Sequence, residues 1–251
     1  MRKHIPNLLT CANLAFGCYA CILALDGNYY GSMLAIIVAA GFDFADGFAA
    51  RLLKAYSTIG KDLDSLADIV SFGVAPGLMV FDFLDHVQKT IHWSHPLTGK
   101  VFLLFAFVIP IFSALRLAKF NHDDRQTDSF IGLPVPAHAL FWTSLIYVLS
   151  LSMEGTAISG MVPQLISIRI PEMPSLFILL FISITAVCSS LLLVSEIPMF
   201  SMKIKSPAWK DNQSRYVLMV IAMVLIVGFG FFGITLSILF FVCLSGISKK
   251  I

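Results

Sequence analysis

Long apolar stretches, separated by short polar segments, follow one another along almost the whole chain. Six of them are about twenty residues long, which is the length that a helix needs to cross a bilayer core. They predict membrane-spanning helices over residues 8–25, 31–53, 61–84, 101–120, 132–152 and 174–195. The pattern therefore predicts an all-α polytopic membrane protein.

A further apolar stretch, over residues 216–247, is too long for one crossing. As a single helix its roughly 32 residues would extend about 48 Å. Gly228, Gly230 and Gly233 lie in its middle. We therefore expect two short helices here, and eight transmembrane helices in total. One long tilted helix after six spans is the alternative.

Basic residues are distributed unevenly between the segments that connect the predicted helices. With the N-terminus in the cytoplasm, only Lys89, Lys100 and Arg169 of the 17 Lys and Arg fall on the opposite side. Cytoplasmic loops of membrane proteins carry an excess of these residues. The distribution predicts that both termini are cytoplasmic. Basic residues at both ends of the last stretch also favour the two-helix version.

Composition supports a membrane protein and excludes other classes. Apolar residues make up 58% of the chain and charged residues 13%, whereas a soluble domain is about half apolar and about a quarter charged. A net charge of +2 gives no indication of nucleic-acid binding. The 5 cysteines lie in apolar stretches without metal-ligand spacing, so they predict buried thiols rather than a disulfide framework.

Four aspartates interrupt the apolar background where the second predicted helix ends and the third begins. Asp43 and Asp46 share one helix face, and Asp64 and Asp68 share another, because residues three or four apart lie on the same side of a helix. A short loop makes the two helices antiparallel neighbours, so their acidic faces can meet at the cytoplasmic end. Carboxylates inside membrane helices are costly and typically functional.

Converging carboxylates repel one another and need protons or cations. Hard divalent ions such as Mg²⁺, Mn²⁺ or Ca²⁺ prefer oxygen ligands, and four acidic groups can hold two ions in the arrangement used for phosphoryl displacement. Gly47, Ala50 and Gly60 lie on the same helix faces and leave room for a bulky ligand, such as a nucleotide. Close helix packing is the alternative explanation for these small residues.

These residues form a motif with fixed spacing, which reads Asp43-x2-Asp46-Gly47-x2-Ala50-Arg51-x8-Gly60-x3-Asp64-x3-Asp68. The motif resembles the signature of the CDP-alcohol phosphatidyltransferases. The resemblance implies transfer of a phosphatidyl group from a CDP-lipid to an alcohol, with release of CMP. It also implies a six-helix catalytic core, two divalent metal ions (Mg²⁺ or Mn²⁺) and a homodimer.

Segments around the motif are similar to the branch of this family that uses L-serine as the acceptor. They cover residues 5–17, 64–76, 115–121 and 130–137. The similarity implies CDP-diacylglycerol and L-serine as substrates and a bacterial-type integral protein of the cytoplasmic membrane. The distribution of basic residues predicts that its active site faces the cytoplasm. We divide the chain accordingly into a transmembrane catalytic domain (1–200), a basic cytoplasmic connector (201–215) and a C-terminal transmembrane hairpin with a basic tail (216–251).

The resemblance and the positions of nearby polar residues together suggest roles for individual residues. The metal ligands would be Asp43, Asp46, Asp64 and Asp68, and Asp68 would also be the general base that takes the serine proton. The CDP-lipid would contact Gly47, Ala50, Arg51, Gly60, Asn7 and Thr10. Serine or a phosphate would contact Arg116, Lys119 and Ser71. Simpler roles stay open for some of them: helix capping for Asn7 and Thr10, membrane anchoring for Arg116 and Lys119, and a hydrogen bond to a helix carbonyl for Ser71.

Two other functions fit parts of the pattern. Glycerol 3-phosphate or inositol phosphate could replace serine as the acceptor, although a phosphorylated acceptor calls for a larger basic cluster. A cation transporter is an alternative from a different class, since intramembrane carboxylates also line ion paths. Transporter sites lie near the bilayer midplane, however, whereas these carboxylates gather at one membrane face.

Overall fold

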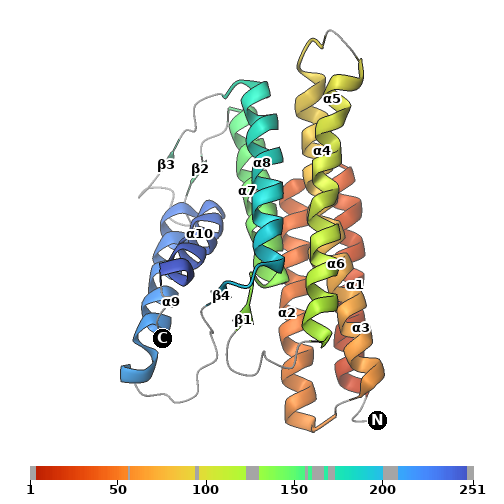
Figure 1. The fold of residues 1–251 in the computed structure, drawn as a ribbon, viewed down its shortest axis with the longest axis vertical. Coiled ribbons are helices and arrows are strands. Elements are labelled where there is room, and N and C mark those ends of the chain that lie inside the picture. The colour runs from red at the N-terminus through yellow and green to blue at the C-terminus, as the bar shows by residue number, and fades with distance from the viewer. Residues whose placement is uncertain are drawn as a thin grey trace.

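The structure, a computed structural model, describes residues 4–55, 57–93, 96–122, 130–155, 158–159, 167–168, 173–199 and 209–247. Within these ranges six helical segments are long and apolar enough to cross a membrane. They run side by side along the long axis of the molecule (Figure 1). This arrangement confirms the predicted class of all-α polytopic membrane protein.

The first three spans carry the motif. They are α1 (His4–Leu25), α2 (Tyr29–Leu53) and a third span built from three helical pieces. Those pieces are α3 (Thr58–Asp68), the π-helix η1 (Ile69–Val74) and α4 (Ala75–Lys89). In η1 the Ala75 amide donates to the Val70 carbonyl, five residues back. Single π-turns occur frequently at functional sites, and this one directly follows Asp68.

The other three spans complete the bundle. The fourth joins α5 (Pro96–Leu103), the 3₁₀ segment η2 (Leu104–Phe107) and α6 (Val108–His122). The fifth and sixth are α7 (Val135–Met153) and α8 (Ser175–Val194). All six spans coincide with predicted stretches, and their ends differ from the predicted ends by a few residues.

The last apolar stretch forms two helices, α9 (Trp209–Phe229) and α10 (Phe232–Ile247), as the glycines predict. Gly230 takes a positive φ of 59° in the turn between them, a conformation that glycine adopts without steric cost. The buried hydroxyls of Ser144 and Thr235 lie 2.7 Å apart and join α10 to α7. The total of eight transmembrane helices, the cytoplasmic termini and the domain division stay predictions. Residues 201–208 of the predicted connector lie outside the described residues.

Among the described residues, four two-residue strands lie between helices. Strand β1 (Phe130–Ile131) pairs antiparallel with β4 (Pro198–Met199). Strand β2 (Ile158–Ser159) pairs antiparallel with β3 (Ser167–Ile168).

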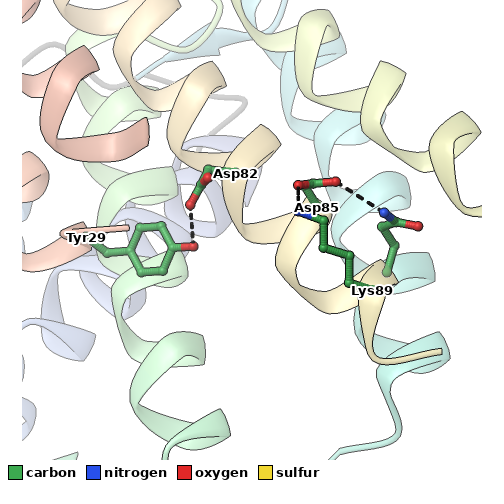
Figure 2. A network of polar contacts seen from close by, with 5 residues as sticks. Tyr29, Asp82, Asp85 and Lys89 are labelled. Carbon is green, nitrogen blue, oxygen red and sulfur yellow. Dashed lines mark hydrogen bonds and ion pairs between the residues drawn. The ribbon is translucent and has the colours of Figure 1, made fainter. Parts of the chain in front are cut away.

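A polar network joins α2 to α4 at the end of the bundle remote from the motif (Figure 2). The Tyr29 hydroxyl donates to Asp82 at 2.8 Å. Lys89 pairs with Asp85 across one helical turn, and Gln88 also donates to Asp85. Such pairs stabilise a helix, so α4 extends beyond the predicted end of the third span at residue 84.

Two clusters of buried apolar side chains form the core between the spans. One lies between α4, α7 and α8 and includes Met79 and Trp142. The other lies between α1, α2, η1, α7 and α8 and includes Ile36 and Phe72. Because Phe72 belongs to the π-helix after Asp68, this second cluster fixes the backbone that carries part of the motif.

Helix α1 packs against the bundle through one stripe of small or polar residues. Its buried members are Pro6, Thr10, Asn13, Gly17, Ala20 and Ala24. Small residues let membrane helices approach closely, and Gly17 lies where α1 meets Ser71 of η1. A Cβ added there would overlap the Ser71 hydroxyl and lie 2.8 Å from the Ser71 Cα atom. Only glycine lets α1 lie this close to η1.

Replacing Gly17 with Ala is therefore expected to lower the free energy of unfolding by about 1–3 kcal/mol, the usual cost of overpacking. The matched control is Gly41→Ala in α2, where an added Cβ meets no atom within 4 Å. That change is expected to be neutral or stabilising, because alanine favours helix more than glycine does. Unfolding in detergent micelles measures both variants, and equal stability of the two would contradict the close contact.

Candidate metal and substrate site

Three aspartates from two helices meet inside the bundle. One carboxylate oxygen from each of Asp43, Asp64 and Asp68 lies within 4.8 Å of the other two. Asp43 comes from α2 and the others from α3, so the predicted meeting of two acidic faces is confirmed for these three residues. Asp68 is buried, with 8% of its surface exposed, and Asp43 and Asp64 are half-buried.

Asp46 lies beside this trio and has a partner of its own. The Thr10 hydroxyl, on α1, donates to Asp46 Oδ2 at 2.6 Å and also lies 3.1 Å from the Pro6 carbonyl oxygen. Asp46 is buried, with 6% exposure. Asp46 does not belong to the group of three carboxylates within 4.8 Å of one another, and its role as a metal ligand stays a prediction.

A tight reversal between α2 and α3 brings the aspartates together. Helix α2 is capped by Lys54, whose backbone is left-handed and whose amide donates to the Ala50 and Arg51 carbonyls. Helix α3 begins after Ser57, whose hydroxyl accepts from the Gly60 amide at 2.9 Å. Both are standard helix caps. They explain how so short a connection turns the chain back on itself.

A first pocket, of about 190 Å³, opens beside Asp46 and Asp64 between α1, α2 and α3. Its lining includes every predicted CDP-lipid contact except Arg51, namely Asn7, Thr10, Gly47, Ala50 and Gly60. An added Cβ at Gly60 would lie 3.1 Å from Asn7 Oδ1, whereas one at Gly47 would meet no atom within 4 Å. Gly60 therefore permits a close approach of helices, and Gly47 leaves open space.

A second pocket, of about 430 Å³, lies beside Asp43 and Asp68. Asp43, Asp68, Arg51 and Arg116 line it together with Gly47. Its remaining lining residues are apolar: Phe44, Leu117, Phe120, Pro134, Val135 and Pro136. Arg116 is 4% exposed and its guanidinium lies 5.3 Å from the centre of the Phe120 ring. The pocket therefore combines two cationic groups with an apolar wall.

Two predicted contacts line neither pocket. Lys119 Nζ donates to the Val194 carbonyl at 3.4 Å and lies 3.9 Å from a carboxylate oxygen of Glu196, so it points to the end of α8. Ser71 is fully buried, and its hydroxyl donates to the Asn13 carbonyl at 3.0 Å. A substrate contact for either residue stays a prediction.

Sequence reasoning missed two residues at this site. Lys61 lines the first pocket, and its Nζ donates to the Asn121 carbonyl at 3.1 Å; its place directly after Gly60 was the available signal. Asn13 donates from Nδ2 to Asp68 Oδ1 at 3.1 Å. No local pattern predicts that second contact, because the residues lie 55 positions apart.

The donor set fits a hard divalent cation. Mg²⁺ and Mn²⁺ prefer oxygen ligands, and three carboxylate oxygens lie within 4.8 Å of one another here. Asp64 Oδ1 is also buried and has no hydrogen-bond partner among the described residues. An orphaned buried acceptor of this kind is costly unless a donor or an ion satisfies it.

Fold and site together define an integral membrane protein with a carboxylate-lined site between membrane helices. The family model for CDP-alcohol phosphatidyltransferase matches residues 3–168, which include the whole motif and both pockets. The chain belongs to the CDP-alcohol phosphatidyltransferase family, and it is a transferase.

Named relatives are similar over half of the chain or more. The CDP-diacylglycerol–serine O-phosphatidyltransferase of Bacillus subtilis is 36% identical over 134 residues, which are 53% of this chain and 70% of the relative. The enzyme of the same name from Mycobacterium tuberculosis is 32% identical over 229 residues, 87% of this chain and 68% of the relative. An archaetidylserine synthase of Methanothermobacter thermautotrophicus is 30% identical over 138 residues, 54% of each chain.

Proposed function

We propose that the chain transfers the phosphatidyl group of CDP-diacylglycerol to the hydroxyl of L-serine, giving phosphatidylserine and CMP. The observation that carries the proposal is the trio of carboxylates between two pockets. The names of the relatives support serine as the acceptor. The positive-inside distribution supports a site that faces the cytoplasm.

The two pockets suit the two parts of the reaction. The first is narrow, bordered by small residues and by Lys61, and suits the CMP portion of the CDP-lipid. The second is larger and has an apolar wall, and so suits the lipid-side phosphate and serine. Arg116 and Arg51 supply positive charge there for a phosphate or for the serine carboxylate. The scissile phosphorus then lies next to the aspartates, of which Asp46 and Asp64 line the first pocket and Asp43 and Asp68 the second.

The transfer step follows from this arrangement. The serine hydroxyl oxygen attacks the lipid-side phosphorus in line, and the bond from that phosphorus to the oxygen of CMP breaks. Asp68 takes the hydroxyl proton as the general base. Asp43, Asp46 and Asp64, with Asp68 close to them, would hold divalent ions, which would supply charge stabilisation for the pyrophosphate and the departing CMP. Because Asp68 lines the second pocket, its carboxylate is on the side where serine binds.

A comparison of acceptors tests the proposal. Purified protein with CDP-diacylglycerol and Mn²⁺ or Mg²⁺ is offered L-serine, glycerol 3-phosphate or inositol phosphate in separate reactions, and CMP is measured. CMP release is expected with serine. Release with one of the phosphorylated acceptors alone would keep the chemistry and replace the acceptor. The absence of release with any of them would contradict transferase activity, and metal-ion flux in proteoliposomes would then test the transporter alternative.

Filling the open space at Gly47 is expected to block substrate binding. Gly47→Leu places a side chain between the two pockets and should raise the KM for CDP-diacylglycerol at least about 10-fold, the effect of about 1.4 kcal/mol of lost binding. The matched control is Gly41→Leu, because Gly41 lies on the same helix, has the same open surroundings and lines neither pocket. An equal KM in the two variants would contradict this placement of the substrate.

A further inference from the structure

Asp68 has a specific hydrogen-bond partner on another helix. Asn13 Nδ2, on α1, donates to Asp68 Oδ1 at 3.1 Å. Asn13 is fully buried, and Asp68 is 8% exposed. A buried hydrogen bond to a carboxylate is charge-assisted and restricts the orientation of both side chains. Asn13 lines neither pocket, so it contacts Asp68 without lining the space proposed for the substrates.

The backbone around Asn13 is held against the same segment of the third span. Ser71, three residues after Asp68, donates to the Asn13 carbonyl at 3.0 Å. Gly17, one turn further along α1, permits this contact because it has no side chain. The contact of Ser71 with Asn13 and Gly17 therefore fixes α1 against η1, close to the point where the Asn13 amide meets Asp68.

One face of α1 reaches two aspartates of the motif in the same manner. Thr10 and Asn13 are three residues apart and so lie on one side of the helix. Thr10 donates to Asp46 and Asn13 donates to Asp68. Both bonds cross between helices and both are buried, so α1 orients carboxylates that α2 and α3 carry.

The chemistry of an amide donor matches the demands on a general base. With Oδ1 engaged by Asn13, Oδ2 is the oxygen of Asp68 that remains to receive a proton. Rotation of the carboxylate would break the bond to Asn13, so the accepting oxygen keeps a fixed direction. Catalytic groups need this kind of support from a second layer of residues.

We propose that Asn13 is a positioning residue for phosphatidyl transfer, which fixes the Asp68 carboxylate through this hydrogen bond. The inference rests on the proposed function, because it concerns the base of that reaction. Loss of the amide is expected to lower kcat about 10- to 100-fold, as for other residues that orient a catalytic group. The KM values for CDP-diacylglycerol and serine should change less than about twofold, since Asn13 touches neither pocket.

A double-mutant cycle separates positioning from structural support. Asn13→Leu removes the donor and keeps a similar volume, and Asn13→Ala removes it without adding apolar bulk, in case the first variant does not fold. Each is combined with Asp68→Asn, and turnover is followed with labelled serine. In the double variants no further loss is expected beyond that of Asp68→Asn, because the group that Asn13 orients is already absent.

The structural control is Ser32→Ala. Ser32 is fully buried and donates to the Ala20 carbonyl at 2.9 Å, so it also joins α1 to another helix, remote from the aspartates. This variant is expected to lose stability and to keep its kcat. Additive losses in the cycle, or a kcat within twofold of the parent in either Asn13 variant, would overturn the role of Asn13. If the parent protein uses another acceptor, the proposed serine specificity is wrong. The role of Asn13 is then tested by the same cycle with that acceptor.

Discussion

Asp68→Asn is expected to lower the turnover of phosphatidyl transfer about 10²- to 10⁴-fold, the usual contribution of a general base. Asparagine has the shape of aspartate but cannot accept the serine proton. CDP-lipid binding should be largely kept, because asparagine keeps the shape of the side chain and Asp68 does not line the first pocket, where the CMP portion is proposed to bind. Labelled serine incorporated into lipid measures turnover, and binding of CDP-diacylglycerol is measured separately by calorimetry in micelles.

A second aspartate of the same helix provides the control. Asp62 lies on α3, is exposed and lines neither pocket. Asp62→Asn removes the same charge from the same helix and is expected to leave turnover unchanged. Near-normal turnover in Asp68→Asn would exclude Asp68 as the base. An equal loss in both variants would mean that helix charge, not the carboxylate at position 68, controls the rate.

Removal of divalent ions is expected to stop transfer, and Mn²⁺ or Mg²⁺ should restore it. In Asp64→Asn the same additions should restore little activity, because one carboxylate of the trio is lost. The affinity of the Asp64→Asn variant for Mn²⁺ should fall at least about 10-fold, because loss of a residue that only supports a metal ligand already has an effect of that size. Electron paramagnetic resonance of free Mn²⁺ measures this affinity. Full activity in the presence of a strong chelator would contradict a metal-dependent reaction.

The control for Asp64→Asn lies at the other end of the bundle. Asp85→Asn also removes a helix-borne carboxylate, one that pairs with Lys89 and lies outside both pockets. It is expected to keep the parent affinity for Mn²⁺. A similar drop in affinity for both variants would indicate scattered binding to acidic groups instead of a site at the trio.

The parts of the structure that depend on local periodicity were predictable from sequence. Six spans follow from the lengths of the apolar stretches, and Gly230 marks the turn between α9 and α10. The meeting of Asp43, Asp64 and Asp68 follows from helical spacing and a short connection. In each case a few neighbouring residues determine the outcome.

Contacts between helices far apart in sequence were not predictable in the same manner. The spacing of Asp43 and Asp46 predicted that both belong to one carboxylate cluster. In the structure Asp46 lies beside that cluster and accepts a hydrogen bond from Thr10 of α1. Lys119 was expected to contact serine or a phosphate, which stays a prediction, but its contacts with a carbonyl and a carboxylate at the end of α8 were not foreseen. The tertiary packing of α1 and α8 decides these contacts.

The π-helix is a further feature that the apolar pattern hides. Residues 69–74 are apolar or small and read as ordinary helix. Pro76 follows two residues later and has no amide hydrogen to give the preceding turn. The Ala75 amide donates to Val70 instead of to the residue four back. Pro76 is the one feature of the sequence that relates to the π-turn. By itself it does not predict one, because proline is also common in the first turn of ordinary helices.

Formation of labelled phosphatidylserine by the purified protein tests most directly whether the aspartate trio performs this transfer. Parent protein and Asp68→Asn are each given CDP-diacylglycerol, labelled L-serine and Mn²⁺, and lipid product and CMP are measured together. We predict equal amounts of phosphatidylserine and CMP from the parent protein, and a rate at least about 10²-fold lower from the variant. Labelled lipid formed at the same rate by both proteins, or CMP released without labelled lipid, would contradict the proposed reaction.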